Sequence, residues 1–172
     1  MTLLLSSEVI ARAPKVLLHD HLDGGLRPQT MIDHALASGY TKLPSYNPEV
    51  LATWFVNACS SGTLELYLET FEHTISVMQT KEEIERVARE CVLDLAADGV
   101  VYAEVRGAPE LFTRKGLTLD QVIEATVEGH KQGMAEAKAA GREIRVEVLL
   151  CALRQNNLSD EVATKVVKYK GR

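Results

Sequence analysis

Three short apolar segments punctuate the chain, and each is bounded by residues that break regular structure. They cover residues 16–21, 99–107 and 144–151, and the first lies between Pro14 and a pair of glycines. Continuous runs rich in Val and Leu are typical of strands covered on both faces, as in a parallel sheet, more than of half-exposed hairpins. The pattern therefore predicts three buried strands.

Helix signals fill the segments between these strands. Thr80 followed by Glu83 forms a capping-box sequence, and apolar residues recur behind it at a spacing of three and four. Thr118 and Gln121 repeat that arrangement ahead of a second apolar stripe, which Gly141 ends. We predict two helices here, each with one buried face.

A third helix is expected to begin at Ser159, where acidic residues follow in the first turn. Its last turn is basic, as the helix dipole favours, with Lys165, Lys168 and Lys170. We interpret these lysines as a solvated helix end and not as a binding patch.

The order of strands and helices indicates an α/β fold with a parallel sheet. The connection over residues 24–99 is long, whereas a whole strand-helix-strand unit takes about 30 residues. It must therefore hold several helices, which we expect to open at Pro28, near Pro48, over 63–78 and at Thr80. Because this helical insertion follows the carboxyl end of a strand, where α/β folds keep their sites, it could cover a pocket.

The composition is that of one globular domain, with 172 residues, 46% hydrophobic and 25% charged. Lys and Arg number 19 against 24 Asp and Glu, which leaves a net charge of −5. Nucleic-acid binding depends on clustered cations that neutralise phosphates, so DNA and RNA are not expected partners.

Cysteine usage and the apolar runs indicate a soluble protein of a reducing compartment. The three cysteines are Cys59, Cys91 and Cys151. Their odd number and wide spacing favour neither a disulfide scaffold nor a thiolate zinc site, and we expect a cytoplasmic protein with small buried thiols. The chain begins with a four-residue apolar run and shows no signal-peptide core or membrane span.

Candidate chemistry appears at the end of the first predicted strand, where His19 and His21 stand two residues apart. Such residues project to the same face of a strand while Asp20 points to the other. Two adjacent imidazoles could bind one zinc ion, or they could be hydrogen-bonded strand-end histidines. Asp23 follows beside two glycines and could accept a hydrogen bond from a substrate hydroxyl, or simply form an Asx turn.

Two segments resemble motifs of the adenosine deaminase family. Residues 14–28, PKVLLHDHLDGGLRP, are similar to the pattern P-K-x-x-L-H-x-H-L-D-G that opens these enzymes and is followed by a helix starting at x-P. Residues 99–109, GVVYAEVRGAP, resemble the family pattern G-V-x-Y-x-E-x-R-x-x-P. Looser matches occur at 63–71 and 151–154. The resemblance therefore extends over most of the chain.

The resemblance implies a (β/α)₈ TIM-type barrel with a helical insertion after the first strand, residues 1–172 supplying about the first three strand-helix units of one domain. His19 and His21 would be two ligands of a catalytic zinc, with His21 also near the nucleoside. Asp23 would accept a hydrogen bond from the ribose 5′-hydroxyl.

The same resemblance places an apolar wall over the ribose on one helix of the insertion. The residues concerned are Leu64, Tyr67, Leu68 and Phe71. Plain core packing is the alternative, since an apolar helical stripe runs from Leu64 to Ile75.

The family's chemistry requires groups that these 172 residues lack. The implied reaction converts adenosine or deoxyadenosine to inosine by attack of a metal-bound hydroxide on the purine. A catalytic zinc needs at least three protein ligands. In the family a His-Ala-Gly-Glu segment gives a third metal His and the acid Glu, a further His is the base, and a Thr-Asp-Asp segment gives the metal Asp. Neither segment occurs here, so we expect no catalytic acid or base in this chain and no activity from it alone.

Two explanations fit an isolated half-barrel. The chain could be the N-terminal half of an enzyme whose C-terminal half is a separate chain, or it could be a non-catalytic binding partner. Within the enzyme reading, adenine or aminofutalosine remain alternative substrates.

The remaining polar residues are expected to be structural. Glu104 and Arg106 share a predicted strand face and should form an ion pair. His130 lies on the apolar stripe of its helix and is expected in the core, while His34 and His73 have no liganding context.

Overall fold

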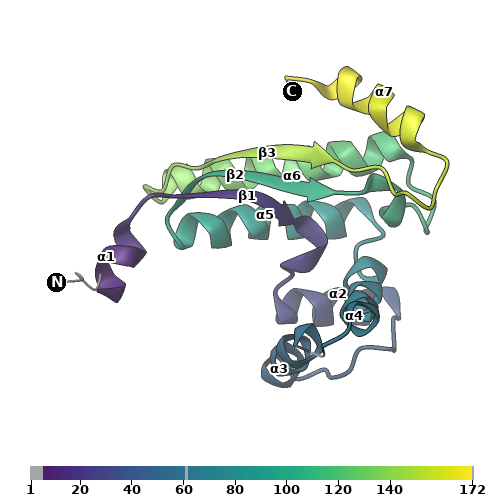
Figure 1. The fold of residues 1–172 in the computed structure, drawn as a ribbon, viewed down its shortest axis with the longest axis horizontal. Helices are drawn as coiled ribbons and strands as arrows, with labels where there is room; N and C mark the ends of the chain where they lie inside the picture. The colour runs from purple at the N-terminus through teal and green to yellow at the C-terminus, as the bar shows by residue number, and fades with distance from the viewer. Residues whose placement is uncertain (1–5, 61, 172) are drawn as a thin grey trace.

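The computed structural model describes residues 6–60 and 62–171. Its centre is a parallel three-stranded sheet in the order β1-β2-β3 (Figure 1). The strands are β1 (Lys15–His21), β2 (Val100–Gly107) and β3 (Arg145–Leu150). Each begins and ends within one residue of the predicted segment, so the three predicted strands are confirmed.

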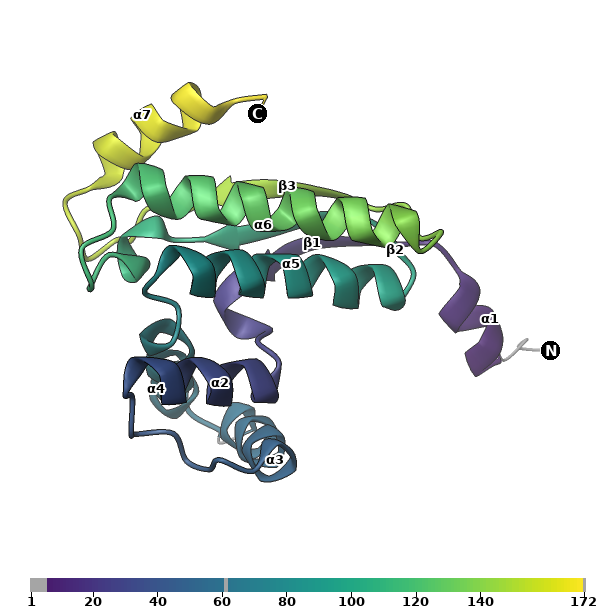
Figure 2. The same cartoon turned by 180° about the vertical axis from the view of Figure 1, so that it is seen from behind.

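Two long helices cover one face of this sheet (Figure 2). They are α5 (Lys81–Ala97) and α6 (Leu119–Ala139). Both predicted capping boxes are present, with Thr80 and Thr118 each accepting from a backbone amide three residues on. Their buried residues join those of the strands in one core, which includes Ile84, Val92, Val105, Phe112, Val122 and Val146.

The predicted helical insertion between β1 and β2 is also observed. It holds α2 (Pro28–Ser38), α3 (Pro48–Cys59) and α4 (Leu64–Ser76), followed by α5. Proline stands in the first turn of α2 and α3, where its missing N–H costs nothing. These helices form a second small core around Met31, Ala35, Leu51 and Val77.

Polar contacts attach the insertion to α5. Arg27 donates three hydrogen bonds to Asp94, the two shortest being 2.6 Å to Oδ1 and 3.0 Å to Oδ2. Thr30 donates to the buried Glu90 at 2.6 Å, and Arg86 donates to the same carboxylate at 2.9 Å. A buried carboxylate is tolerated when such donors surround it, so Glu90 fixes where the insertion sits.

The third predicted helix is α7 (Ser159–Tyr169). Its lysines are not simply solvated: Lys165 and Lys168 lie 2.7 Å and 2.8 Å from the carboxylate of Asp120 on α6. That carboxylate also accepts from the Tyr169 hydroxyl at 2.9 Å. These donors hold the pKa of Asp120 below its usual value. The basic turn therefore attaches α7 to α6, which corrects the expectation.

Three short elements were not predicted. They are α1 (Ser7–Arg12) and the 3-10 helices η1 (Leu22–Gly24) and η2 (Pro109–Phe112). Each is too short to show a hydrophobic period. The helix α1 has no buried residue, whereas η1 and η2 follow the carboxyl ends of β1 and β2 and help to shape that edge of the sheet. Among the described residues, no helix combines the length and apolar character needed to cross a bilayer.

Candidate functional site

The imidazoles of His19 and His21 lie together at the carboxyl end of β1. Their ring centroids are 5.5 Å apart and the ring planes are inclined by 53°. Strand alternation is not what brings them together, because His19 has a φ of 67° and the pairing with β2 shifts between Leu18 and Asp20. A non-glycine residue in this left-handed region is strained, and such strain is often held at functional sites.

Arg106 of β2 contacts the first of these imidazoles. Its Nη1 atom lies 2.6 Å from His19 Nε2. Because a guanidinium can only donate, Nε2 accepts this hydrogen bond and its lone pair is engaged by Arg106. The predicted ion pair between Glu104 and Arg106 is therefore wrong: Glu104 instead accepts from the Tyr102 hydroxyl at 3.1 Å.

Asp23 lies in η1, two residues after His21, and is 5% exposed. Its Oδ1 atom is 3.7 Å from His21 Nδ1. Burial raises the pKa of this carboxyl, and the nearby His21 and Arg106 oppose the rise. The buried acid thus faces the histidines.

Aromatic side chains of α4 extend from His21 away from the sheet. The ring of Phe71 meets His21 edge-on at 6.2 Å, and Tyr67 meets Phe71 at 5.4 Å. With Asp23 these two aromatics line a cavity of about 420 Å³ beneath the strand end, which α2 and α3 complete through Met31 and other apolar residues.

Leu64 lies outside this cavity. It is 65% exposed, and Leu68 on the same side of α4 is 54% exposed, while Ile75 at the other end of the stripe is buried. The alternative of plain core packing therefore fails for the first turns of α4. The structure brings His19, His21, Asp23, Tyr67 and Phe71 to one place and leaves Leu64 at its margin.

Two imidazoles at this spacing fit two positions of a zinc site, where nitrogen ligands are common. A third ligand is missing, because the described part of the chain contains no group of three or more His, Cys, Asp or Glu side chains that could hold a metal ion. The residues present therefore fit part of a zinc site.

Two residues of this edge were not assigned to the site from the sequence. Arg106 could have been found from strand register, since it pairs with His21 across β1 and β2. The buried Glu110 of η2 accepts from the Leu153 amide at 2.7 Å and from Asn156 Nδ2 at 2.8 Å. It joins the segments that follow β2 and β3, and no local sequence motif indicates this contact.

The other histidines are structural, as expected. His130 is 2% exposed in the core. His34 is buried with Nδ1 3.0 Å from the Val77 carbonyl, and His73 Nδ1 lies 2.9 Å from the Tyr40 hydroxyl. None of these contacts involves a second metal-ligating side chain.

The cysteines agree only partly with the expectation of buried thiols. All three are free. Burial raises the pKa of Cys91 to about 12, which makes it an unreactive thiol. Cys59 is exposed, and Cys151 is only partly buried.

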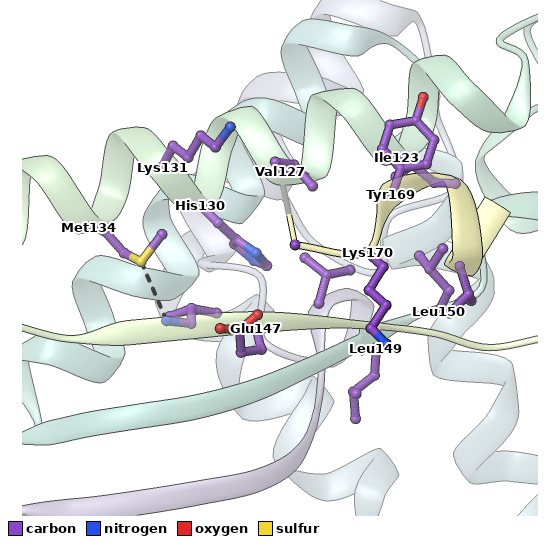
Figure 3. A pocket seen from close by; sticks show the side chains of 14 residues that line it. Ile123, Val127, His130, Lys131, Met134, Glu147, Leu149, Leu150, Tyr169 and Lys170 are labelled. Carbon is purple, nitrogen blue, oxygen red and sulfur yellow. Dashed lines mark hydrogen bonds between the residues drawn. The ribbon is translucent and has the colours of Figure 1, made fainter.

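A second cavity, of about 380 Å³, lies between α6, β3 and α7 (Figure 3). His130 and Met134 enter it from α6, and Tyr169 closes it from α7. Neither ring nitrogen of His130 has a hydrogen-bond partner among the described residues. This cavity shares no lining residue with the cavity at Asp23.

The chain is similar to curated proteins named adenosine deaminase. It is 54% identical to the adenosine deaminase of Mycobacteroides abscessus over 172 residues, which are 100% of this chain and 48% of that protein. It is 54% identical to adenosine deaminase 1 of Streptomyces coelicolor over 165 residues, 96% of this chain and 42% of that one. The chain thus spans about half the length of the curated relatives it matches.

Solved structures share its fold. An amidohydrolase from Burkholderia ambifaria with bound Zn aligns with a TM-score of 0.71 at 22% identity, over 96% of this chain and 43% of that chain. The adenine deaminase from Arthrobacter aurescens aligns with a TM-score of 0.68 at 24% identity, over 90% and 45%. The predicted fold class, three strand-helix units of a deaminase barrel, is confirmed. Because the family model described as adenosine deaminase also matches residues 14–172, this chain belongs to the adenosine deaminase family.

Proposed function

We propose that the chain supplies the first three strand-helix units of a zinc-dependent aminohydrolase that converts adenosine to inosine and ammonia. The observation that carries this proposal is the pair of imidazoles 5.5 Å apart at the end of β1, in a member of the adenosine deaminase family. The buried Asp23 beside them supports a ligand with a hydroxyl group.

His19 and His21 would hold the zinc ion through neutral ring nitrogens. When bound, zinc acts as a Lewis acid that makes hydroxide available at neutral pH. In this structure Arg106 Nη1 lies 2.6 Å from His19 Nε2, so a zinc ion bound at that nitrogen would take the place of the guanidinium. Asp20 fixes the backbone between the two ligands by accepting from the His21 amide at 3.0 Å.

The nucleoside would bind on the side of η1 and α4. There Asp23 accepts a hydrogen bond from the ribose hydroxyl, and Tyr67 and Phe71 form the apolar wall of the 420 Å³ cavity. We assign Leu64 to the outer margin of that wall, since it is exposed and not in the cavity. Exposed apolar side chains beside a cavity are suited to covering a bound ligand.

The working enzyme would also need the C-terminal half of the domain. The curated relatives are about twice as long as this chain, and a catalytic zinc needs at least one more protein ligand than the two found here. The three free cysteines support a reducing compartment such as the cytoplasm.

The test joins this chain to the part of the M. abscessus relative that the match leaves uncovered; we call the product the joined domain. Zinc content and ammonia release from adenosine are measured for the joined domain, for His19→Ala and for the control His73→Gln. We expect about one zinc per joined domain, and loss of zinc and activity in His19→Ala only, since removing a ligand degrades the site. Equal zinc content in His19→Ala and the parent would refute the proposal.

A further inference from the structure

One face of the sheet carries no helix, opposite the face that α5 and α6 cover (Figures 1 and 2). Apolar side chains are exposed on it: Val16 is 61% and Leu18 is 58% exposed, and Leu149 of β3 is 37% exposed. These side chains lie on the two outer strands of the sheet, and exposed apolar side chains gathered on one face are typical of an interaction surface. This face therefore has the character of an interface.

Charged side chains form the middle of the same face. Strand register places Glu104 of β2 directly beside Glu147 of β3, and Tyr102 beside Arg145. Arg145 pairs with Glu147, with its Nε atom 2.7 Å from Oε1. Glu104 receives only the Tyr102 hydroxyl, at 3.1 Å.

Glu104 is thus the carboxylate without a cation. No Lys, Arg or His nitrogen within the described ranges lies within 4.0 Å of it, because Arg145 is engaged with Glu147 and Arg106 contacts His19. In water this arrangement is tolerable. Once the face is covered, a buried carboxylate beside a second carboxylate is costly unless a cation joins it.

We propose that the second half of the deaminase domain, where it covers this sheet face, presents a Lys or Arg side chain to Glu104. The inference rests on the proposed function, which requires such a half. The charge of Glu104 is then neutralised, and apolar contacts of Val16, Leu18 and Leu149 surround the resulting ion pair.

Charge decides between this occupant and a second copy of the chain. In a symmetric dimer the same patch meets itself, so the unpaired Glu104 of one copy would face the acidic centre of the other. Like charges placed opposite each other are unfavourable across an interface. A cationic partner is what the face lacks.

The test compares thermal unfolding of the joined domain with that of its Glu104→Gln variant. Gln keeps the shape and still accepts from the Tyr102 hydroxyl, so only the charge is lost. If a cation faces Glu104, the midpoint of unfolding falls by roughly 5 °C or more, since removing one partner of a buried ion pair leaves the other charge buried and unpaired. Glu143→Gln, which removes an exposed ion pair with Lys138 outside the sheet, is the matched control and should change little.

An unchanged or raised midpoint in Glu104→Gln would overturn the inference, because relief of repulsion from Glu147 would then dominate. If Glu104→Gln yields no folded domain, Glu104→Asp decides: it keeps the charge, so it must restore folding, and its failure would also overturn the inference. Zinc content separates the two proposals. A joined domain that binds zinc but keeps the same unfolding midpoint in Glu104→Gln refutes only the inference about Glu104, whereas one that binds no zinc refutes the proposed function.

Discussion

The carboxylate of Asp23 lies 3.7 Å from His21 Nδ1 and is almost fully buried, although it belongs to a three-residue helix that follows the strand. This buried acid lines the same cavity as Tyr67 and Phe71, so a ligand held there could donate a hydrogen bond to it. This relationship supports the assignment of a sugar hydroxyl to Asp23.

Asp23→Ala in the joined domain should lower kcat/KM for adenosine by roughly 10- to 100-fold, the range expected for a hydrogen bond to a charged group. Turnover of free adenine, which has no ribose, should fall much less. Parallel assays with both substrates make the comparison, and equal losses would remove the assigned role.

His130 should make the stability of the chain depend on pH. Burial lowers its pKa from 6.5 to about 4, so the folded chain keeps it neutral while the unfolded chain binds a proton below pH 6.5. Its contribution to stability is therefore complete above pH 6.5 and is lost as the pH falls toward 4, by up to roughly 3 kcal/mol. Urea unfolding at pH 7.5 and pH 5 measures the loss.

The control for this effect is His130→Leu, which cannot titrate and leaves no unpaired ring nitrogen in the core. The pH dependence of its unfolding free energy should be shallower than that of the parent over this window. Identical slopes for the two proteins would show that other groups cause the acid sensitivity.

Gly129 on α6 should be intolerant of any side chain. A Cβ there would lie 2.4 Å from the Glu85 carbonyl oxygen and 2.7 Å from the Ala88 Cβ on α5. Gly129→Ala must therefore push the two helices apart, and we expect a loss of about 1–3 kcal/mol in the unfolding free energy. Gly107→Ala, with no atom within 4 Å of the added Cβ, is the comparison and should cost clearly less.

Asp120 should control the attachment of α7. Asp120→Asn keeps the shape but weakens the contacts with Lys165, Lys168 and Tyr169. We expect faster amide hydrogen exchange in α7 and no change in β1, because only Val162 of that helix is buried. Glu128→Gln, an exposed change on α6, should leave amide exchange in α7 unchanged. If exchange in α7 is the same in Asp120→Asn as in the parent, this account is contradicted.

Local sequence determined where most of the strands and helices lie. These signals affect only neighbouring residues, so their effects can be predicted without knowing the fold. They are the Val-rich runs, the capping residues Thr80 and Thr118, and the prolines that open α2 and α3. The family motif likewise directed attention to His19, His21 and Asp23.

Only the tertiary structure decided which side chains meet across the chain. The lysines of α7 bind Asp120, more than 40 residues away, and Arg106 turns to His19 instead of Glu104. Hydrophobic periodicity tells which face of an element is buried but not which distant charge lies opposite it. The strained backbone of His19 has the same origin, since the shifted pairing of β1 with β2 exists only once both strands are in place.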